Sequence, residues 1–205
     1  MKYFIFDMGG VLLKTINEDL LKNENSYVKC NTLEEEKFFL NTFIDYEKGN
    51  ITTSEYVDIL GPFFNKKGLT TDEYEKDYYD NGVKYGGAFP NAFSLLNNLK
   101  KEGHKIYLLS NLHETSFKDF SKIFDITIFN ELFLSFKLHM VKPNKQIFQY
   151  VINKIGDNPC NMFFFDDRKE NVDTAIECGI NAFVTTGEIL EKNINLAKKV
   201  KWYIV

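Results

Sequence analysis

The sequence Met1-Lys-Tyr-Phe-Ile-Phe-Asp7-Met-Gly-Gly-Val11 decides the fold of this chain. Tyr3 to Phe6 form an uninterrupted apolar run, rich in aromatic residues, which is typical of a fully buried β-strand. Asp7 follows this run directly, and Gly9 and Gly10 follow Asp7. Glycines let backbone N–H groups approach an anion closely, and open α/β sheets bind ligands at the carboxyl ends of their strands. The stretch therefore predicts either a strand that presents Asp7 to a ligand or a plain strand followed by a turn.

The composition is that of an ordinary globular protein. The 205 residues suffice for one domain with a sizeable insertion or for two small domains, and 44% of them are hydrophobic and 26% charged. A net charge of −4 gives no reason to expect nucleic acid or an anionic membrane as a partner. Arg168 is the only arginine, so an anion site must depend on lysine and backbone amides.

Targeting signals are also not expected. The first apolar run has no preceding charged region and no cleavage site after it, so we expect no signal peptide. No stretch approaches the roughly 20 apolar residues of a membrane span. Cys30, Cys160 and Cys178 are odd in number and widely spaced, which fits reduced thiols. These features predict a cytoplasmic protein.

Residues 15–87 form a segment whose apolar residues recur at helical spacing. Thr52 with Glu55, and Thr70 with Glu73, have the spacing of capping boxes at helix N-termini. The segment predicts a small helical bundle, in which most of the apolar positions only build the core. We expect its helices at about 16–28, 32–48, 53–66 and 71–84.

From residue 88 onward, short apolar runs alternate with segments of helical periodicity. This alternation predicts a parallel sheet with right-handed crossovers. Because Tyr3 to Phe6 belong to the same sheet, we predict an α/β core of residues 1–14 and 88–205, with residues 15–87 inserted in it. Strands are expected at 105–109, 126–129, 161–165 and 180–184, helices at about 90–101, 114–122, 144–155 and 169–178, and a closing helix with a short extended end over 190–205.

Polar residues follow the predicted strands where a parallel sheet would bring them together. Ser110-Asn111 and Asp166-Asp167 each follow a strand, and Lys142-Pro143 lies in a loop between them. Carboxylates crowded beside Asp7 would repel one another unless a cation lies among them, and an all-oxygen cluster suits Mg²⁺. Lys142 and Ser110 would hold the oxygens of a phosphoryl group. Each motif alone is common as a turn, a helix cap or solvated surface.

Together the motifs resemble those of the haloacid dehalogenase superfamily of hydrolases. The resemblance lies in Phe6–Val11, Leu109–Asn111, Lys142-Pro143 and Phe165–Asp167, in that superfamily's usual order. It implies a Rossmann-like parallel-sheet core with helices on both faces, and it makes residues 15–87 similar to a C1-type α-helical cap. Tyr46–Thr52 and Ser135–Pro143 are similar to the subgroup of bacterial α-D-glucose-1-phosphatase-like sugar-phosphate phosphatases.

The resemblance also implies a mechanism. Asp7 would be the nucleophile, forming an aspartyl-phosphate that water then hydrolyses. Mg²⁺ would be held by Asp7, the carbonyl of Gly9 and Asp166, with Asp167 beside it or reaching it through water. The groups expected to bind the phosphoryl oxygens or the substrate are Met8, Gly9, Ser110, Asn111 and Lys142.

Gly9 departs from the superfamily's pattern, in which a second Asp at this position acts as general acid and base. General acid–base catalysis is typically worth about 10²- to 10⁴-fold, so the glycine implies slow turnover, a good leaving group or another acid. His113 could supply that acid or contact substrate, although a surface histidine at a helix start is the plainer interpretation. Weak candidates for substrate specificity surround Gly49: Tyr46, Glu47, Lys48 and Asn50.

The predicted function is therefore a Mg²⁺-dependent phosphomonoester hydrolase acting on a small sugar phosphate or similar metabolite. One alternative is a catalytically weak phosphate-binding or interaction protein that kept the fold. A metal-independent haloacid dehalogenase would resemble enzymes that use an arginine near the first motif and have no Asp-Asp pair. This alternative is disfavoured because no arginine precedes Arg168 and the Asp166-Asp167 pair is retained. A mutase is disfavoured because it depends on the acid–base Asp that Gly9 replaces. Neither the substrate nor the oligomeric state follows from these motifs.

Overall fold

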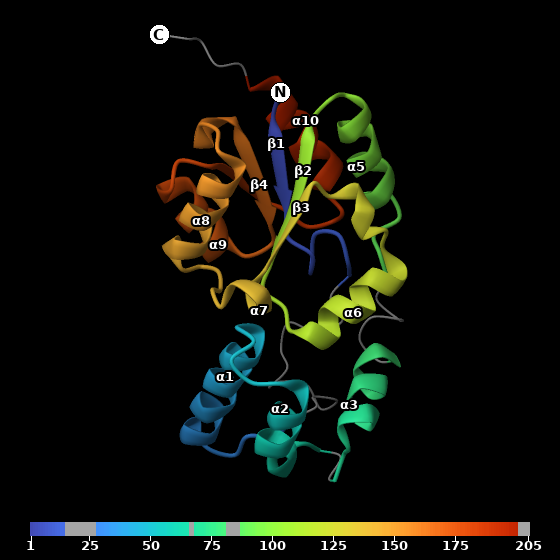
Figure 1. The fold of residues 1–205 in the computed structure, drawn as a ribbon, viewed down its shortest axis with the longest axis vertical. Coiled ribbons are helices and arrows are strands. Elements are labelled where there is room, and N and C mark those ends of the chain that lie inside the picture. The colour runs from blue at the N-terminus through green and yellow to red at the C-terminus, as the bar shows by residue number, and fades with distance from the viewer. Residues whose placement is uncertain (15–27, 66–67, 81–86, 201–205) are drawn as a thin grey trace.

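The computed structural model describes residues 1–14, 28–65, 68–80 and 87–200, and its centre is a five-stranded sheet (Figure 1). All neighbouring strands are parallel, in the order β3-β2-β1-β4-β5. The strand that carries Tyr3 to Phe6 is thus central, and it is buried, as predicted. The strands are β1 (Tyr3–Phe6), β2 (Lys105–Ser110), β3 (Glu131–Leu134), β4 (Met162–Asp166) and β5 (Asn181–Val184).

Helices cover both faces of the sheet, which confirms the predicted fold class. On one face the strands pack against α5 (Ala92–Lys101), α6 (Glu114–Ile123) and α10 (Leu190–Lys199). On the other face they pack against α8 (Lys145–Ile155) and α9 (Lys169–Glu177) (Figure 1). Side chains alternate between the faces along a strand, so the apolar residues of β1 and β4 contribute to both layers of the core.

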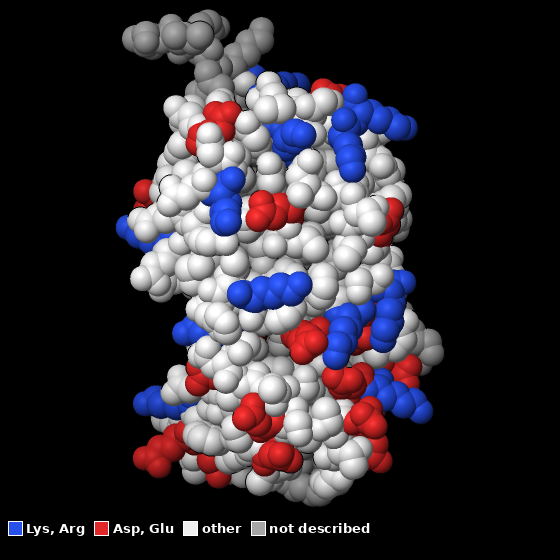
Figure 2. Space-filling model, in the orientation of Figure 1, with Lys and Arg blue, Asp and Glu red and all other residues white. Residues whose placement is uncertain are grey.

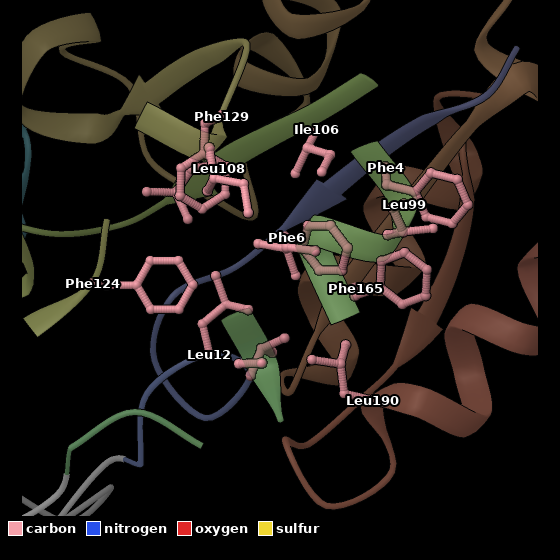
Figure 3. Close-up of a cluster of buried hydrophobic side chains, with 14 of the residues drawn as sticks. Phe4, Phe6, Leu12, Leu99, Ile106, Leu108, Phe124, Phe129, Phe165 and Leu190 are labelled. Carbon is pink, nitrogen blue, oxygen red and sulfur yellow. The ribbon is translucent and has the colours of Figure 1, made fainter. Parts of the chain in front are cut away.

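Phenylalanine rings stack across the two central strands. Phe4 faces Phe163 with ring centroids 5.6 Å apart, and Phe6 faces Phe165 at 5.0 Å. Figure 3 shows three of these rings, those of Phe4, Phe6 and Phe165, with leucines around them. All four are fully buried, and such stacking adds to the stabilisation from burial. The stack fixes how β1 and β4 lie beside each other immediately before Asp7 and Asp166.

The helical segment forms a separate bundle below the carboxyl edge of the sheet (Figure 1). It consists of α1 (Leu33–Glu47), α2 (Thr53–Leu60), a 3₁₀ turn (Gly61–Phe63) and α3 (Thr71–Tyr78), packed on their own apolar cluster. We refer to it as the cap. The predicted domain limits stay a prediction, because residues 15–27 and 81–86, and with them the predicted helix at 16–28, lie outside the described residues.

Both capping boxes in the cap are confirmed. Thr52 accepts a hydrogen bond from the N–H of Glu55 at 3.2 Å, and the Glu55 carboxylate accepts one from the N–H of Thr52 at 2.7 Å. Thr70 and Glu73 repeat the arrangement at the start of α3. The helix predicted over 53–66 ends earlier, at Leu60, and the chain continues as the 3₁₀ turn that contains the glycine and proline of the next two positions.

One predicted strand is wrong. Residues 126–129 contain a 3₁₀ turn, Ile126–Ile128, and the edge strand β3 comes later in the chain. Asp125 caps this turn by accepting hydrogen bonds from the N–H and hydroxyl of Thr127. Asn130 then pairs with Ile106 of β2 through both its backbone N–H and its side-chain oxygen, so the regular ladder starts only after it.

The described surface carries charges of both signs. In the view of Figure 2, lysines and acidic residues are interspersed over core and cap, without a continuous basic patch among the residues described there. Within the described ranges, no helix combines the length and apolarity needed to cross a membrane.

Candidate active site

The predicted motif residues lie at the carboxyl ends of adjacent central strands. Asp7 directly follows β1, Ser110 is the last residue of β2, and Asp166 is the last residue of β4. The N–H of Asp7 donates to the carbonyl of Phe165 at 2.9 Å, which aligns the ends of β1 and β4. Carboxylate oxygens of Asp7, Asp166 and Asp167 lie within 4.8 Å of one another. The structure thus brings together the three acids that the sequence placed at this edge.

Lys142 lies at the centre of this group. Its Nζ is 2.9 Å from Oδ1 of Asp7 and 2.6 Å from Oδ2 of Asp166, and it also donates to the carbonyl of Leu109 at 3.0 Å. The residue is only 4% exposed. Ser110 donates its hydroxyl proton to the same oxygen of Asp7 at 2.7 Å. One oxygen of Asp7 is therefore held by an ammonium and a hydroxyl at once.

Asn111 positions the loop that carries Lys142. Its side-chain oxygen accepts from the N–H of Lys142, and its side-chain nitrogen donates to the carbonyl of Lys142, both at 2.8 Å. This two-way pairing ties the loop to the end of β2. The sequence predicted for Asn111 only a part in binding the phosphoryl group or the substrate, so the clamp is a structural role that the motif did not reveal.

Asp166 is held by groups that sequence reasoning missed. Its Oδ1 accepts from the side-chain nitrogen of Asn171 and from the N–H of Arg168, each at 2.9 Å. Asn171 is buried on the first turns of α9. In the sequence, this role is signalled by the position of Asn171 five residues after the acid that ends a strand. That signal is weak.

Burial and the neighbouring charges together raise the pKa values of Asp7, Asp167 and Lys142. Burial raises the pKa of Asp7, although the positive charge of Lys142 opposes the shift. Burial also raises the pKa of Asp167 to about 7, and the charges of Asp7 and Asp166 add to this effect. Burial lowers the pKa of Lys142, but the charges of Asp166 and Asp7 outweigh it and leave the pKa above its ordinary value. One ammonium among three carboxylates leaves the site short of positive charge.

The loop after Asp7 leaves backbone donors available for an anion. The carbonyl of Met8 accepts from the N–H groups of Leu12 and Leu13, both at 2.9 Å, which folds the loop into a tight turn. No described residue accepts a hydrogen bond from the N–H of Met8 or Gly9. Gly10 has φ of +72°, and a side chain there would overlap the carboxylate of Asp167. The turn therefore requires glycine at this position.

His113 is not the surface histidine that we expected. It begins α6 as predicted, but it is only 2% exposed, because the cap covers it. Its ring stacks on Tyr46 with centroids 4.2 Å apart and meets Tyr78 edge-on. Burial lowers its pKa to about 3, so the ring is neutral at ordinary pH. The neutral ring fills the contact between cap and core and carries no acidic proton to give to a leaving group.

Of the four cap residues proposed for specificity, three have other roles or none that the contacts show. Tyr46 is buried and shares hydrogen bonds with Thr53 and Thr115. Asn50 donates to Asp45 in an exposed turn, and Lys48 only ends α1. The fourth residue is Glu47. Burial raises the pKa of its carboxyl group, Lys142 opposes this shift and Asp7 adds to it.

A separate groove of about 550 Å³ lies between α3 and α6. Its lining includes Glu75, Lys118, Asp119 and Lys122 but none of the motif residues. Lys118 of α6 contacts Glu75 of α3 at 3.9 Å, and Lys122 contacts Asp119 within α6 at 2.7 Å, so these charges of the groove lining pair with one another. The groove is distinct from the site around Asp7.

Comparison with known proteins identifies the family. Residues 1–179 match the model of haloacid dehalogenase-like hydrolases. The chain is 26% identical over 186 residues to a sesquiterpene phosphatase, astK, of Aspergillus oryzae, covering 87% of each protein. It is 24% identical over 198 residues to a D-ribitol-5-phosphate phosphatase of Bacteroides thetaiotaomicron, covering 89% of this chain and 91% of that protein.

A solved structure gives the same result. A haloacid dehalogenase family enzyme from Bacteroides thetaiotaomicron, crystallised with magnesium and inorganic phosphate, superposes with a TM-score of 0.75 at 29% identity. The match covers 91% of this chain and 95% of that enzyme. Family model, relatives and fold agree with the motifs assembled at the carboxyl edge of the sheet. The chain belongs to the haloacid dehalogenase-like hydrolase family.

Proposed function

We propose that the protein is a Mg²⁺-dependent phosphomonoester hydrolase that works through an aspartyl-phosphate intermediate. The observation that carries the proposal is the arrangement around Asp7, whose Oδ1 is held by Ser110 at 2.7 Å and by Lys142 at 2.9 Å beside two further carboxylates. Its relatives are named as phosphatases of small phosphorylated compounds, which supports a small phosphorylated metabolite, such as a sugar phosphate, as substrate. A cytoplasmic location stays a prediction of the sequence.

The donor set fits magnesium. Asp7, Asp166 and Asp167 supply carboxylate oxygens close to one another, and Gly9 would add its carbonyl. Mg²⁺ prefers a few such oxygens together with waters and a phosphate. Burial raises the pKa values of Asp7 and Asp167, and the negative charges of neighbouring carboxylates add to both shifts. The site therefore carries a local excess of negative charge. When bound, the ion would offset that excess and withdraw charge from the phosphoryl oxygens.

The remaining residues would bind and orient the phosphoryl group. Asp7 attacks phosphorus, the bond to the leaving oxygen breaks, and water later hydrolyses the aspartyl-phosphate. Lys142, Ser110 and the N–H groups of Met8, Gly9 and Asn111 would donate hydrogen bonds to the phosphoryl oxygens that become more negative in the transition state. Since a carboxylate is the nucleophile, positioning matters more than deprotonation.

Hydrolysis of p-nitrophenyl phosphate with and without Mg²⁺ tests the proposal, with the Asp7→Asn variant as control. We expect p-nitrophenol release by the native protein that requires Mg²⁺ and is lost on addition of EDTA and in the variant. Release no greater than that of the variant, over a panel of phosphate esters, would instead support a phosphate-binding or interaction protein. Halide release from a haloacid that persists in EDTA would support dehalogenation.

A further inference from the structure

The backbone of the cap residue Glu47 is fixed against the catalytic edge of the core. It is the last residue of α1, and its carbonyl accepts a hydrogen bond from the Ser135 hydroxyl at 2.6 Å. The same hydroxyl contacts the backbone N–H and carbonyl of Leu112, two residues beyond Ser110. Figure 1 shows this end of α1 against α7 (Ser135–Leu138), below the carboxyl edge of the sheet. Cap, edge strand and phosphoryl-binding loop therefore meet at Glu47.

The turn after Glu47 also fits closely against the core. Gly49 adopts φ of +66°, and a side chain there would overlap the backbone carbonyl of Phe136. The N–H groups of Lys48 and Gly49 close the turn onto Ile44 and Tyr46. This packing leaves the backbone around Glu47 little freedom, so the direction in which its side chain leaves the cap is set by the fold.

The carboxyl group of Glu47 has no partner among the described residues. It is half-buried, and no hydrogen bond or ion pair to it is formed there. It nevertheless lies within electrostatic range of Lys142, Arg168 and Asp7. The pKa values of the Tyr56 and Tyr78 hydroxyl groups are raised chiefly by burial, and the charge of Glu47 adds to the shift. A half-buried carboxyl group that no described residue holds, within electrostatic range of the nucleophile, is free to contact a substrate bound at the site.

Neither of the other candidate acids is available. Position 9 is glycine, and His113 is sealed in the contact between cap and core with its pKa lowered to about 3. Burial raises the pKa of Glu47 to about 7, opposed by Lys142 and Arg168 and assisted by Asp7. A protonated fraction is thus present near neutral pH, which a general acid requires.

We propose that Glu47 is the general acid and base of the reaction. The cap would thus supply the carboxyl group that position 9, a glycine, does not provide. As Asp7 bonds to phosphorus and the bond between phosphorus and the leaving oxygen breaks, the Glu47 carboxyl transfers its proton to that oxygen. The carboxylate then takes a proton from the water that attacks the aspartyl-phosphate. Inorganic phosphate leaves, and both acids return to their starting states. This inference rests on the proposed phosphatase function.

The test compares substrates that differ in how much protonation their leaving groups need. The Glu47→Gln variant and the native protein are assayed at one pH with p-nitrophenyl phosphate, whose leaving group departs readily as an anion, and with glycerol 2-phosphate, whose alkoxide does not. A single pH is used because Asp167 titrates in the same range as Glu47. We expect kcat on glycerol 2-phosphate to fall by about 10²-fold or more, and kcat on p-nitrophenyl phosphate to change by less than about threefold.

Two further variants keep the result interpretable. Glu34→Gln makes the same charge change at an exposed position in the first turn of α1, and we expect native rates on both substrates. Glu47→Asp retains a carboxyl group one methylene shorter, so it should recover part of the alkyl phosphatase activity. Thermal melting of each variant checks that it is folded.

The outcomes separate this inference from the proposed function. An equal loss of kcat on both substrates would make Glu47 a structural residue and overturn the inference. A rise in KM for glycerol 2-phosphate with kcat unchanged would overturn it too, because Glu47 would then only bind substrate. In both cases Mg²⁺-dependent hydrolysis by the native protein would leave the phosphatase function standing. A native protein inactive on every ester would instead remove that function, and this inference with it.

Discussion

Replacing Lys142 by methionine tests the charge balance of the site, because it removes one ammonium from among three carboxylates at nearly constant volume. Lys142 makes ion pairs of 2.9 Å with Asp7 and 2.6 Å with Asp166, and both lysine and Asp166 are buried. Removing one partner of a buried ion pair typically costs about 3–5 kcal/mol, since the other charge stays buried without compensation. We expect a loss of that size in the free energy of unfolding at pH 7, without metal.

The loss should depend on pH in a definite direction. Lys142 now opposes the rise in the pKa of Asp7, so its removal should raise that pKa further. Between the ordinary carboxyl range and the raised pKa, the folded state binds more protons than the unfolded state. Stability therefore falls as the pH rises through this window. The variant should be closest to the native protein near pH 5 and furthest from it at pH 7.

Urea unfolding of both proteins at pH 5 and pH 7, each in EDTA and in Mg²⁺, measures these differences. Mg²⁺ should narrow the gap at pH 7, because it replaces part of the missing positive charge. Lys145→Met is the matched control. Lys145 pairs with Glu177 on the exposed surface, so its loss should cost less than about 1 kcal/mol. A Lys142→Met protein as stable as the control variant in EDTA at pH 7 would refute the reasoning.

Three other substitutions test separate parts of the structure. Gly10→Ala should reduce phosphatase activity strongly and weaken Mg²⁺ binding measured by calorimetry, because a side chain there overlaps Asp167 and the positive φ disfavours it by about 1–2 kcal/mol. Asn111→Ala removes both hydrogen bonds to the Lys142 backbone; we expect a lower kcat at nearly unchanged KM and native-like circular dichroism. Phe165→Ala empties a fully buried ring position and should cost about 3–5 kcal/mol in urea unfolding, and a loss below about 1 kcal/mol would contradict its place in the core.

The sequence was most informative where local and long-range signals agreed. The apolar run before Asp7 and the run before Asp166 have no polar residue for a solvent-facing side, and both became central strands. The capping boxes at Thr52 and Thr70 form because their partners lie three residues away, so no tertiary knowledge was needed. The meeting of the acids followed from the parallel topology alone.

Features that depend on tertiary contacts were the ones that sequence reasoning missed. The apolar run at 126–129 predicted a strand there. The start of β3 is instead set by hydrogen bonds between Asn130 and the neighbouring strand β2. The burial of His113 depends on Tyr46 and Tyr78 of the cap, which are distant along the chain. Asn111 offers no hint in its own neighbourhood that it clamps Lys142.

The phenylalanine stack between β1 and β4 has a consequence for how the protein would respond to heat. The rings that precede Asp7 and Asp166, 5.0 Å apart between Phe6 and Phe165, help to hold the two strand ends at the spacing that the hydrogen bond from the Asp7 N–H to the Phe165 carbonyl also supports. Apolar contacts thus help to set the distance between the two carboxylates that would bind the metal ion. Warming that loosens the rings would widen the gap first, so affinity for a divalent ion should decline at temperatures where the backbone is still folded.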